Sequence, residues 1–98
     1  MVVGTCRIAL EFPGSTSLKE KRGPVRSIIT RMRSSFNAAV AEVDGQDSWT
    51  EAILGVAVIS NDARHANAML SKIVAFVDAN LSDGILSDHA IEILHLDD

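Results

Sequence analysis

Residues 37–60, NAAVAEVDGQDSWTEAILGVAVIS, contain two apolar stretches on either side of a short polar loop. The stretches at residues 37–44 and 52–60 are rich in Ala, Val and Ile and have the length of β-strands. The loop between them, GQDSWTE, contains the only tryptophan of the chain. We therefore predict a β-hairpin here, and its place in the chain decides the order of the other elements.

A strand and a helix are predicted before the hairpin. Residues 2–12 alternate between apolar and polar side chains, which indicates a half-buried strand. Ser17 and Glu20 have the spacing of a capping box, so a helix is expected to begin at Ser17 and to end near Ser35. Gly23-Pro24 interrupts this helix, because an interior proline costs about 3 kcal/mol. We expect either a kink at this pair or a separate short turn before a helix that begins at Pro24.

A second helix and a last strand are predicted after the hairpin. Ser60 or Asn61 is expected to cap the helix, and HAIEILHL at residues 89–96 is expected to form the strand. The resulting order, βαββαβ, predicts an α+β fold of the ferredoxin-like sandwich type in one domain, residues 1–98. Its antiparallel sheet carries both helices on one face.

Composition agrees with one small globular domain: 47% of the 98 residues are hydrophobic and 22% are charged. The single cysteine, Cys6, excludes an intrachain disulfide, and its place in an apolar alternation is typical of a small buried hydrophobe rather than a reactive thiol. Because the sequence has neither a signal-peptide pattern nor an apolar run of about 20 residues, we expect a cytoplasmic protein with no membrane partner.

Positive charge is concentrated in the first third of a chain whose formal net charge is −4. On a helix, Lys19, Arg22, Arg26 and Arg33 share one face, and such a stripe can follow phosphate groups. The alternative is a solvated helix surface whose arginine stems cover the edge of the core. With Ser17 and Lys21, these residues form the candidate nucleic-acid or anion-binding site.

The segment PGSTSLK, residues 13–19, offers a second possibility for anion binding. Backbone N–H groups at a helix start, together with the hydroxyls of Ser15, Thr16 and Ser17, suit a phosphate or a carboxylate. Simple N-capping by Ser17 explains the same residues without a ligand, and this interpretation is favoured.

The sheet face away from the helices is predicted to be small and flat. If Cys6 and its alternating neighbours face the helices, Arg7, Ala9, Gly55 and Ala57 lie on the other face, which is therefore a candidate surface for homodimer formation. This face lacks the aromatic side chains with which an RNA-recognition motif stacks bases, so a standard motif of that kind is excluded.

The hairpin loop presents Asp44, Gln46, Asp47 and Trp49 as a further candidate surface. Trp49 is either a lid on the core or an exposed contact residue, and the high average burial of tryptophan favours the lid. No residue spacing in the chain indicates a catalytic nucleophile, a pair of catalytic acids or a metal site. We therefore expect no enzymatic activity, no metal and no cofactor.

Two segments, PGSTSLKEKRGPVRSI and FNAAVAEVDGQDSWTEAILGVAVISND, are similar to the YlxP-like family of small bacterial proteins of unknown function. The resemblance covers essentially the whole chain and implies the ferredoxin-like sandwich. Genes of this family often lie among genes for translation and ribosome maturation, which implies a role near rRNA or the small ribosomal subunit. The chain departs from the family pattern at Gly23-Pro24 and at Gly45.

Two functional hypotheses follow. The first is a non-enzymatic accessory protein that binds structured RNA or the small ribosomal subunit, with no DNA partner expected, through the basic helix face. The alternative is a homo-oligomeric protein-interaction module whose basic helix docks an acidic protein partner.

Overall fold

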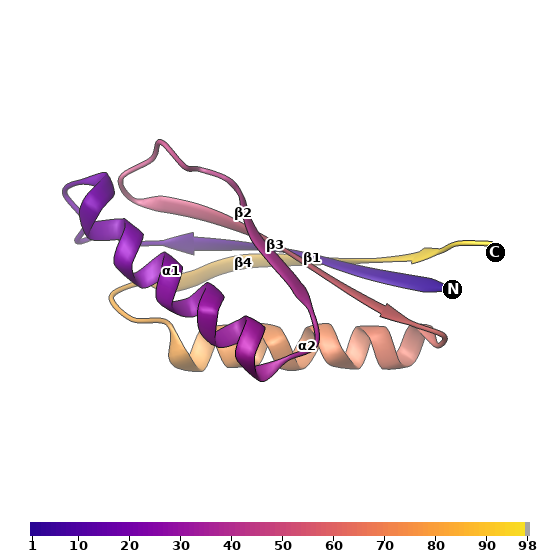
Figure 1. Cartoon of the computed structure of the whole chain (residues 1–98). Coiled ribbons are helices and arrows are strands. Elements are labelled where there is room, and N and C mark those ends of the chain that lie inside the picture. The colour runs from indigo at the N-terminus through magenta and orange to yellow at the C-terminus, as the bar shows by residue number, and fades with distance from the viewer. Residues whose placement is uncertain (98) are drawn as a thin grey trace.

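The computed structural model of the protein describes residues 1–97 and has the element order β1–α1–β2–β3–α2–β4 (Figure 1). The elements are β1 (Val2–Glu11), α1 (Leu18–Ser35), β2 (Ala39–Asp44), β3 (Glu51–Ser60), α2 (Ala63–Asn80) and β4 (Ile85–His95). The strands form one sheet in the order β2-β3-β1-β4, and every neighbouring pair is antiparallel. The predicted ferredoxin-like arrangement is confirmed.

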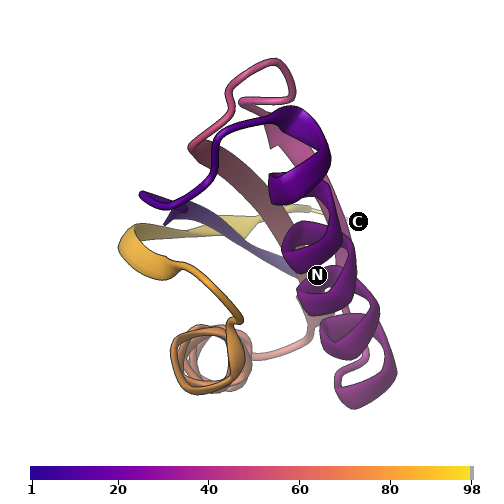
Figure 2. The same cartoon turned by 90° about the vertical axis from the view of Figure 1, so that its left-hand side faces the viewer.

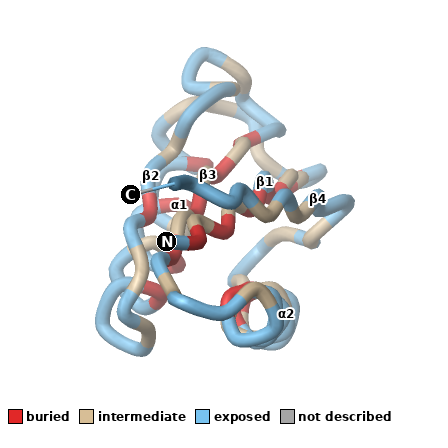
Figure 3. Tube along the Cα trace, turned by 90° about the vertical axis from the view of Figure 1, so that its right-hand side faces the viewer, coloured by how far each residue is buried: buried red, intermediate tan, exposed pale blue. Residues whose placement is uncertain are grey.

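Both helices lie on the same face of the sheet, so the molecule has two layers (Figure 1, Figure 2). Alternate residues of the central strands point between these layers, and the buried positions run along β1 and β3 (Figure 3). Gly4 lets α2 approach β1 closely, because a Cβ atom at this position would lie 2.9 Å from Leu70 Cδ1. The core is almost entirely aliphatic; its members on the helices are Val25, Ile28, Met32, Ala66, Leu70, Ile73 and Val77.

Helix α1 runs as one element through Gly23-Pro24. The expectation of a separate turn before a helix beginning at Pro24 is therefore wrong. Buried side chains on both sides of the proline, Lys21 and Val25, hold the two parts of the helix against the same surface. This burial offsets the hydrogen bond that Pro24 cannot donate.

Several predicted boundaries differ from the structure by one or more residues, and two of them have a clear physical cause. Asp62, rather than Ser60 or Asn61, caps α2, and its side chain accepts a hydrogen bond from the Arg64 N–H (3.1 Å). Strand β4 begins at Ile85 instead of residue 89, because it pairs with β1 as far as Glu11. A register shift in this pairing, opposite Ala9 and Leu10, breaks the simple alternation that marks a strand in a sequence.

Cys6 is buried, as expected for a small hydrophobic residue. Removal of the side chain from water raises the pKa of its thiol, and a backbone hydrogen bond involving Ala90 opposes this effect only in part. A buried thiol with a raised pKa is a poor nucleophile at neutral pH.

Candidate nucleic-acid interface

Three basic side chains project from one edge of α1. Lys19, Arg22 and Arg26 are exposed, and their spacing of three and four residues places them on one side of the helix. Within residues 1–97, none of the three forms a hydrogen bond or an ion pair through its side chain. We call these three residues the basic edge.

The other arginines near the end of α1 bind within the protein. Arg33 Nη2 donates a hydrogen bond to the Val40 carbonyl (2.6 Å), which ties the end of the helix to β2. Arg31 donates to the Asn80 carbonyl (3.0 Å) and to Asn80 Oδ1 (2.8 Å), and its guanidinium lies 5.7 Å from the centre of the Phe76 ring. Arg33 belongs to the predicted basic stripe, but its side chain forms a hydrogen bond within the protein and is only partly available to a ligand.

Lys21 also forms its hydrogen bonds within the protein. It is only 4% exposed, and its ammonium donates hydrogen bonds to the carbonyls of Gly45 (2.7 Å) and Glu51 (2.8 Å). The expectation that Lys21 contacts an external anion is wrong, because its Nζ is directed into the β2–β3 connection. Lys21 lies three residues after Leu18 and four before Val25, so its position on the apolar side of the helix was visible in the sequence.

The start of α1 is capped by its own side chains. Ser17 Oγ accepts a hydrogen bond from the Glu20 N–H (3.1 Å), which confirms Ser17 as the N-cap. The Glu20 carboxylate accepts from the Thr16 N–H (2.7 Å) and the Thr16 hydroxyl (3.0 Å), and these bonds lower the pKa of Glu20. This carboxylate occupies donors that an external phosphate would need, so the geometry favours N-capping without a ligand.

The hairpin loop is held by local hydrogen bonds. Gly45 has a positive φ of 79°, and its N–H donates to Asp44 Oδ1 (2.7 Å). Gln46 Nε2 donates to the Glu42 carbonyl (3.3 Å), whereas Asp47 is exposed without such a bond within the described chain. The loop thus places two acids and an amide at its surface.

Trp49 is 57% exposed, so the expectation that it forms a lid on the core is wrong. Phe12 is fully buried at this end of the core, and its N–H donates to the Thr50 carbonyl (2.7 Å). This bond holds the loop backbone beside the sheet, and the indole of Trp49 stays on the outside of the fold.

A small pocket of about 150 Å³ lies between α1 and the hairpin. Arg22 and Arg26 line it together with Glu42 and Gln46, and apolar side chains of α1 complete the wall. One carboxylate oxygen of Glu42 is buried without a hydrogen bond and lies 3.9 Å from Lys21 Nζ. Two of the three residues of the basic edge, Arg22 and Arg26, therefore line a pocket that also contains polar side chains.

Across residues 1–97, no three His, Cys, Asp or Glu side chains are grouped in a way that would hold a metal ion. In the same part of the chain, neither helix combines the length and the hydropathy needed to cross a membrane.

Comparison with known proteins agrees with the resemblance drawn from the motifs. The chain is 35% identical over 63 residues to the uncharacterized protein YlxP of Bacillus subtilis (strain 168), an alignment that covers 64% of this chain and 68% of the relative. A family model described as a protein of unknown function (DUF503) matches residues 3–89. The chain therefore belongs to this family of uncharacterised proteins.

Proposed function

We propose that this protein is a non-enzymatic accessory factor that binds structured RNA, such as rRNA in the small ribosomal subunit, through the basic edge of α1. One observation carries the proposal. Lys21, Arg31 and Arg33 are used in internal hydrogen bonds, whereas Lys19, Arg22 and Arg26 remain aligned, exposed and without side-chain partners in the described chain.

The chemistry of the basic edge suits phosphates. Each guanidinium presents a planar fork of N–H donors that matches two phosphate oxygens, and Lys19 adds a mobile point charge. Trp49, on the loop that Lys21 holds against α1, offers an exposed ring on which an unpaired base can stack. The net charge of −4 repels phosphates elsewhere, so binding is restricted to one orientation.

Co-sedimentation with purified small ribosomal subunits across a salt series tests the proposal. Three phosphate contacts predict that log K falls with log[salt] with a slope of about −2 to −3. In the double variant Arg22→Glu/Arg26→Glu, affinity is expected to fall at least about tenfold, and the slope is expected to shrink to about −1 because only the Lys19 contact remains. The control is Arg64→Glu/Lys72→Glu on α2, which takes the net charge from −4 to the same −8 while the basic edge stays intact.

Equal losses in the two variants would show a response to net charge alone and would refute the role of the basic edge. Absence of wild-type binding at low salt would refute the RNA proposal as a whole. In that case the same unpaired cations would favour the alternative function, the docking of an acidic protein surface on α1.

A further inference from the structure

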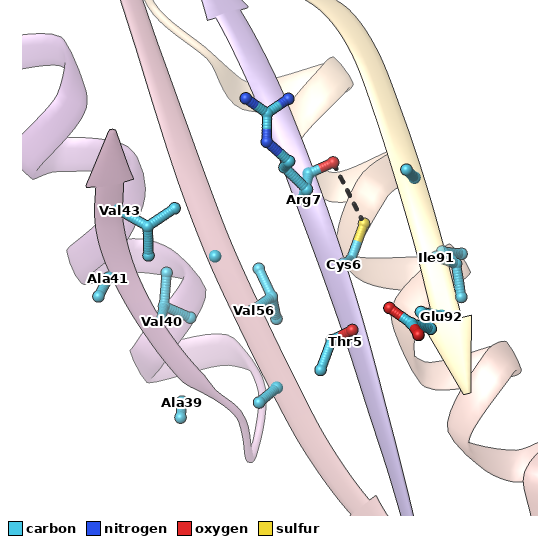
Figure 4. Close-up of a pocket in the computed structure, with 13 residues that line it drawn as sticks. Thr5, Cys6, Arg7, Ala39, Val40, Ala41, Val43, Val56, Ile91 and Glu92 are labelled. Atoms are coloured by element: carbon cyan, nitrogen blue, oxygen red, sulfur yellow. Dashed lines mark hydrogen bonds between the residues drawn. The ribbon is translucent and has the colours of Figure 1, made fainter. Parts of the chain in front are cut away.

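The face of the sheet opposite the two helices is not covered by another element of the described chain (Figure 2). The residues at its centre are mostly apolar. A shallow groove of about 790 Å³ runs across it. Its lining comes from all four strands and is mostly small and aliphatic, but it also includes Arg7 and Glu92 (Figure 4). Larger apolar side chains are also exposed on this face: Val43, which lines the groove, is 55% exposed, and Ile59 on β3 is 68% exposed. A surface of this kind is costly to leave in water, because burial of apolar area contributes about 25 cal/mol per Å².

The centre of this face is flat enough for another sheet to approach. Ala41, Gly55, Arg7 and Ala90 form one row across the four strands, so three of the four central positions carry little or no side chain. A Cβ atom on Gly55 would lie 2.8 Å from Val43 Cγ1, which shows that Val43 folds over the glycine and fills the space above it. Packed sheets lie about 10 Å apart, a distance that small side chains permit.

Two opposite charges near the centre of this face, Arg7 and Glu92, indicate which partner covers it. The other acids on the face, Glu11, Glu51 and Asp88, lie toward one end of the strands. Arg7 on β1 pairs in register with Ala90, and Glu92 on β4 pairs with Thr5, so the two charges lie one row apart on neighbouring strands (Figure 4). Neither forms an ion pair within the described chain. A partner that covers the face must therefore present an acid near Arg7 and a base near Glu92, since an unpaired buried charge is strongly unfavourable.

A second copy of the chain meets both requirements at once. Next to the row that contains Arg7 lies a second row, formed by Ala39, Ala57, Thr5 and Glu92. Consider a two-fold axis that lies between the two facing sheets, perpendicular to the strands and midway between these two rows. This axis places the Arg7 row of each copy opposite the Thr5 row of the other. Each Arg7 then lies beside Glu92 of the second copy, and the symmetry forms this contact twice.

We infer that the protein forms a symmetric dimer through its open sheet faces, with Arg7 of each copy paired with Glu92 of the other. At about 3.3 Å per residue and about 4.8 Å between strands, the four strands cover about 590 Å² per copy, or about 1,200 Å² in total. This area reaches the lower limit of specific protein interfaces. The inference does not depend on RNA binding, because the helices and the basic edge face outward in the dimer.

Sedimentation velocity from low to high micromolar concentration tests the dimer, with two charge-reversal variants. Arg7→Glu and Glu92→Arg each place like charges together twice in a homodimer, so each alone is expected to weaken the dimer at least about tenfold. An equimolar mixture of the two variants is expected to recover the dimer, because every contact across the interface is then between opposite charges. Lys72→Glu, on α2 at the far side of the molecule, is the control and is expected to dimerise like the wild type.

Two results would overturn the inference. A wild-type protein that stays monomeric at high micromolar concentration shows that the face is not used between copies. A dimer that survives both single reversals uses another surface.

Thermal unfolding of each variant verifies that it is folded, and the recovery in the mixture can arise only between chains. Subunit binding by a monomeric Arg7→Glu variant separates failure of the dimer from failure of the RNA proposal.

Discussion

Replacement of Lys21 by methionine tests the internal contact that joins α1 to the β2–β3 hairpin. Lys21→Met keeps a long apolar side chain between Leu18 and Val25 but removes the ammonium group. The change takes one donor from each of two carbonyl groups, at Gly45 and Glu51, and leaves the buried Glu42 oxygen without its neighbouring cation. The Gly45 carbonyl keeps its hydrogen bond from the Ser48 N–H (3.0 Å). The structure thus predicts a large loss of stability, which arises only from the contacts between α1 and the β2–β3 hairpin.

The magnitude follows from the two short hydrogen bonds. A hydrogen bond from a charged donor contributes about 1.5–3 kcal/mol, and removal of one partner from a buried ionic contact costs about 3–5 kcal/mol. We expect Lys21→Met to lower the free energy of unfolding by about 3–5 kcal/mol, a large share of the roughly 5–15 kcal/mol typical of a domain. For a domain of this size, the midpoint of thermal unfolding should fall by at least about 12 °C.

Urea unfolding followed by far-ultraviolet circular dichroism measures this loss. Lys72→Met on α2 is the matched control, because Lys72 is exposed and makes no side-chain bond in the described chain. Its effect should stay within about 0.5 kcal/mol. A loss below about 1 kcal/mol for Lys21→Met would refute the reasoning, since it would mean that the ammonium contributes no more than a surface charge.

Two further predictions concern α1. Gly23 lies inside the helix, and apart from its chain neighbours and the nearby helix backbone, a Cβ atom there would meet nothing within 4 Å. Gly23→Ala should therefore raise the free energy of unfolding by about 0.5–1 kcal/mol in urea titrations; a decrease would mean that the glycine relieves strain beside Pro24. Hydrogen bonds from Thr16 lower the pKa of Glu20 in the folded state. The carboxylate therefore stabilises the fold at pH values above its unfolded pKa of about 4.3, and this stabilisation is lost as the pH falls through the folded pKa. The wild type should therefore melt above Glu20→Gln at neutral pH, and the two midpoints should converge in acid; parallel melting curves at every pH would contradict this assignment.

The types of most elements could be predicted because their signals are local. Alternation along β1, the capping box at Ser17 and the two apolar stretches of the hairpin each reflect interactions within a few residues. Boundaries were less accurate where distant pairing decided them. Strand β4 is extended by its contacts with β1, and this pairing includes a register shift that its own sequence does not reveal.

The sequence by itself determined the order of elements, the aliphatic core and the basic character of α1, because periodicity and composition act over short distances. Only the tertiary structure decided which cations remain free. Lys21 bonds to carbonyls 24 and 30 residues away, and Arg31 bonds to Asn80, 49 residues away. Such contacts depend on how α1, the hairpin and α2 pack together. For the same reason, the fold buries Lys21 while Trp49 remains exposed, against the average preference of each residue type.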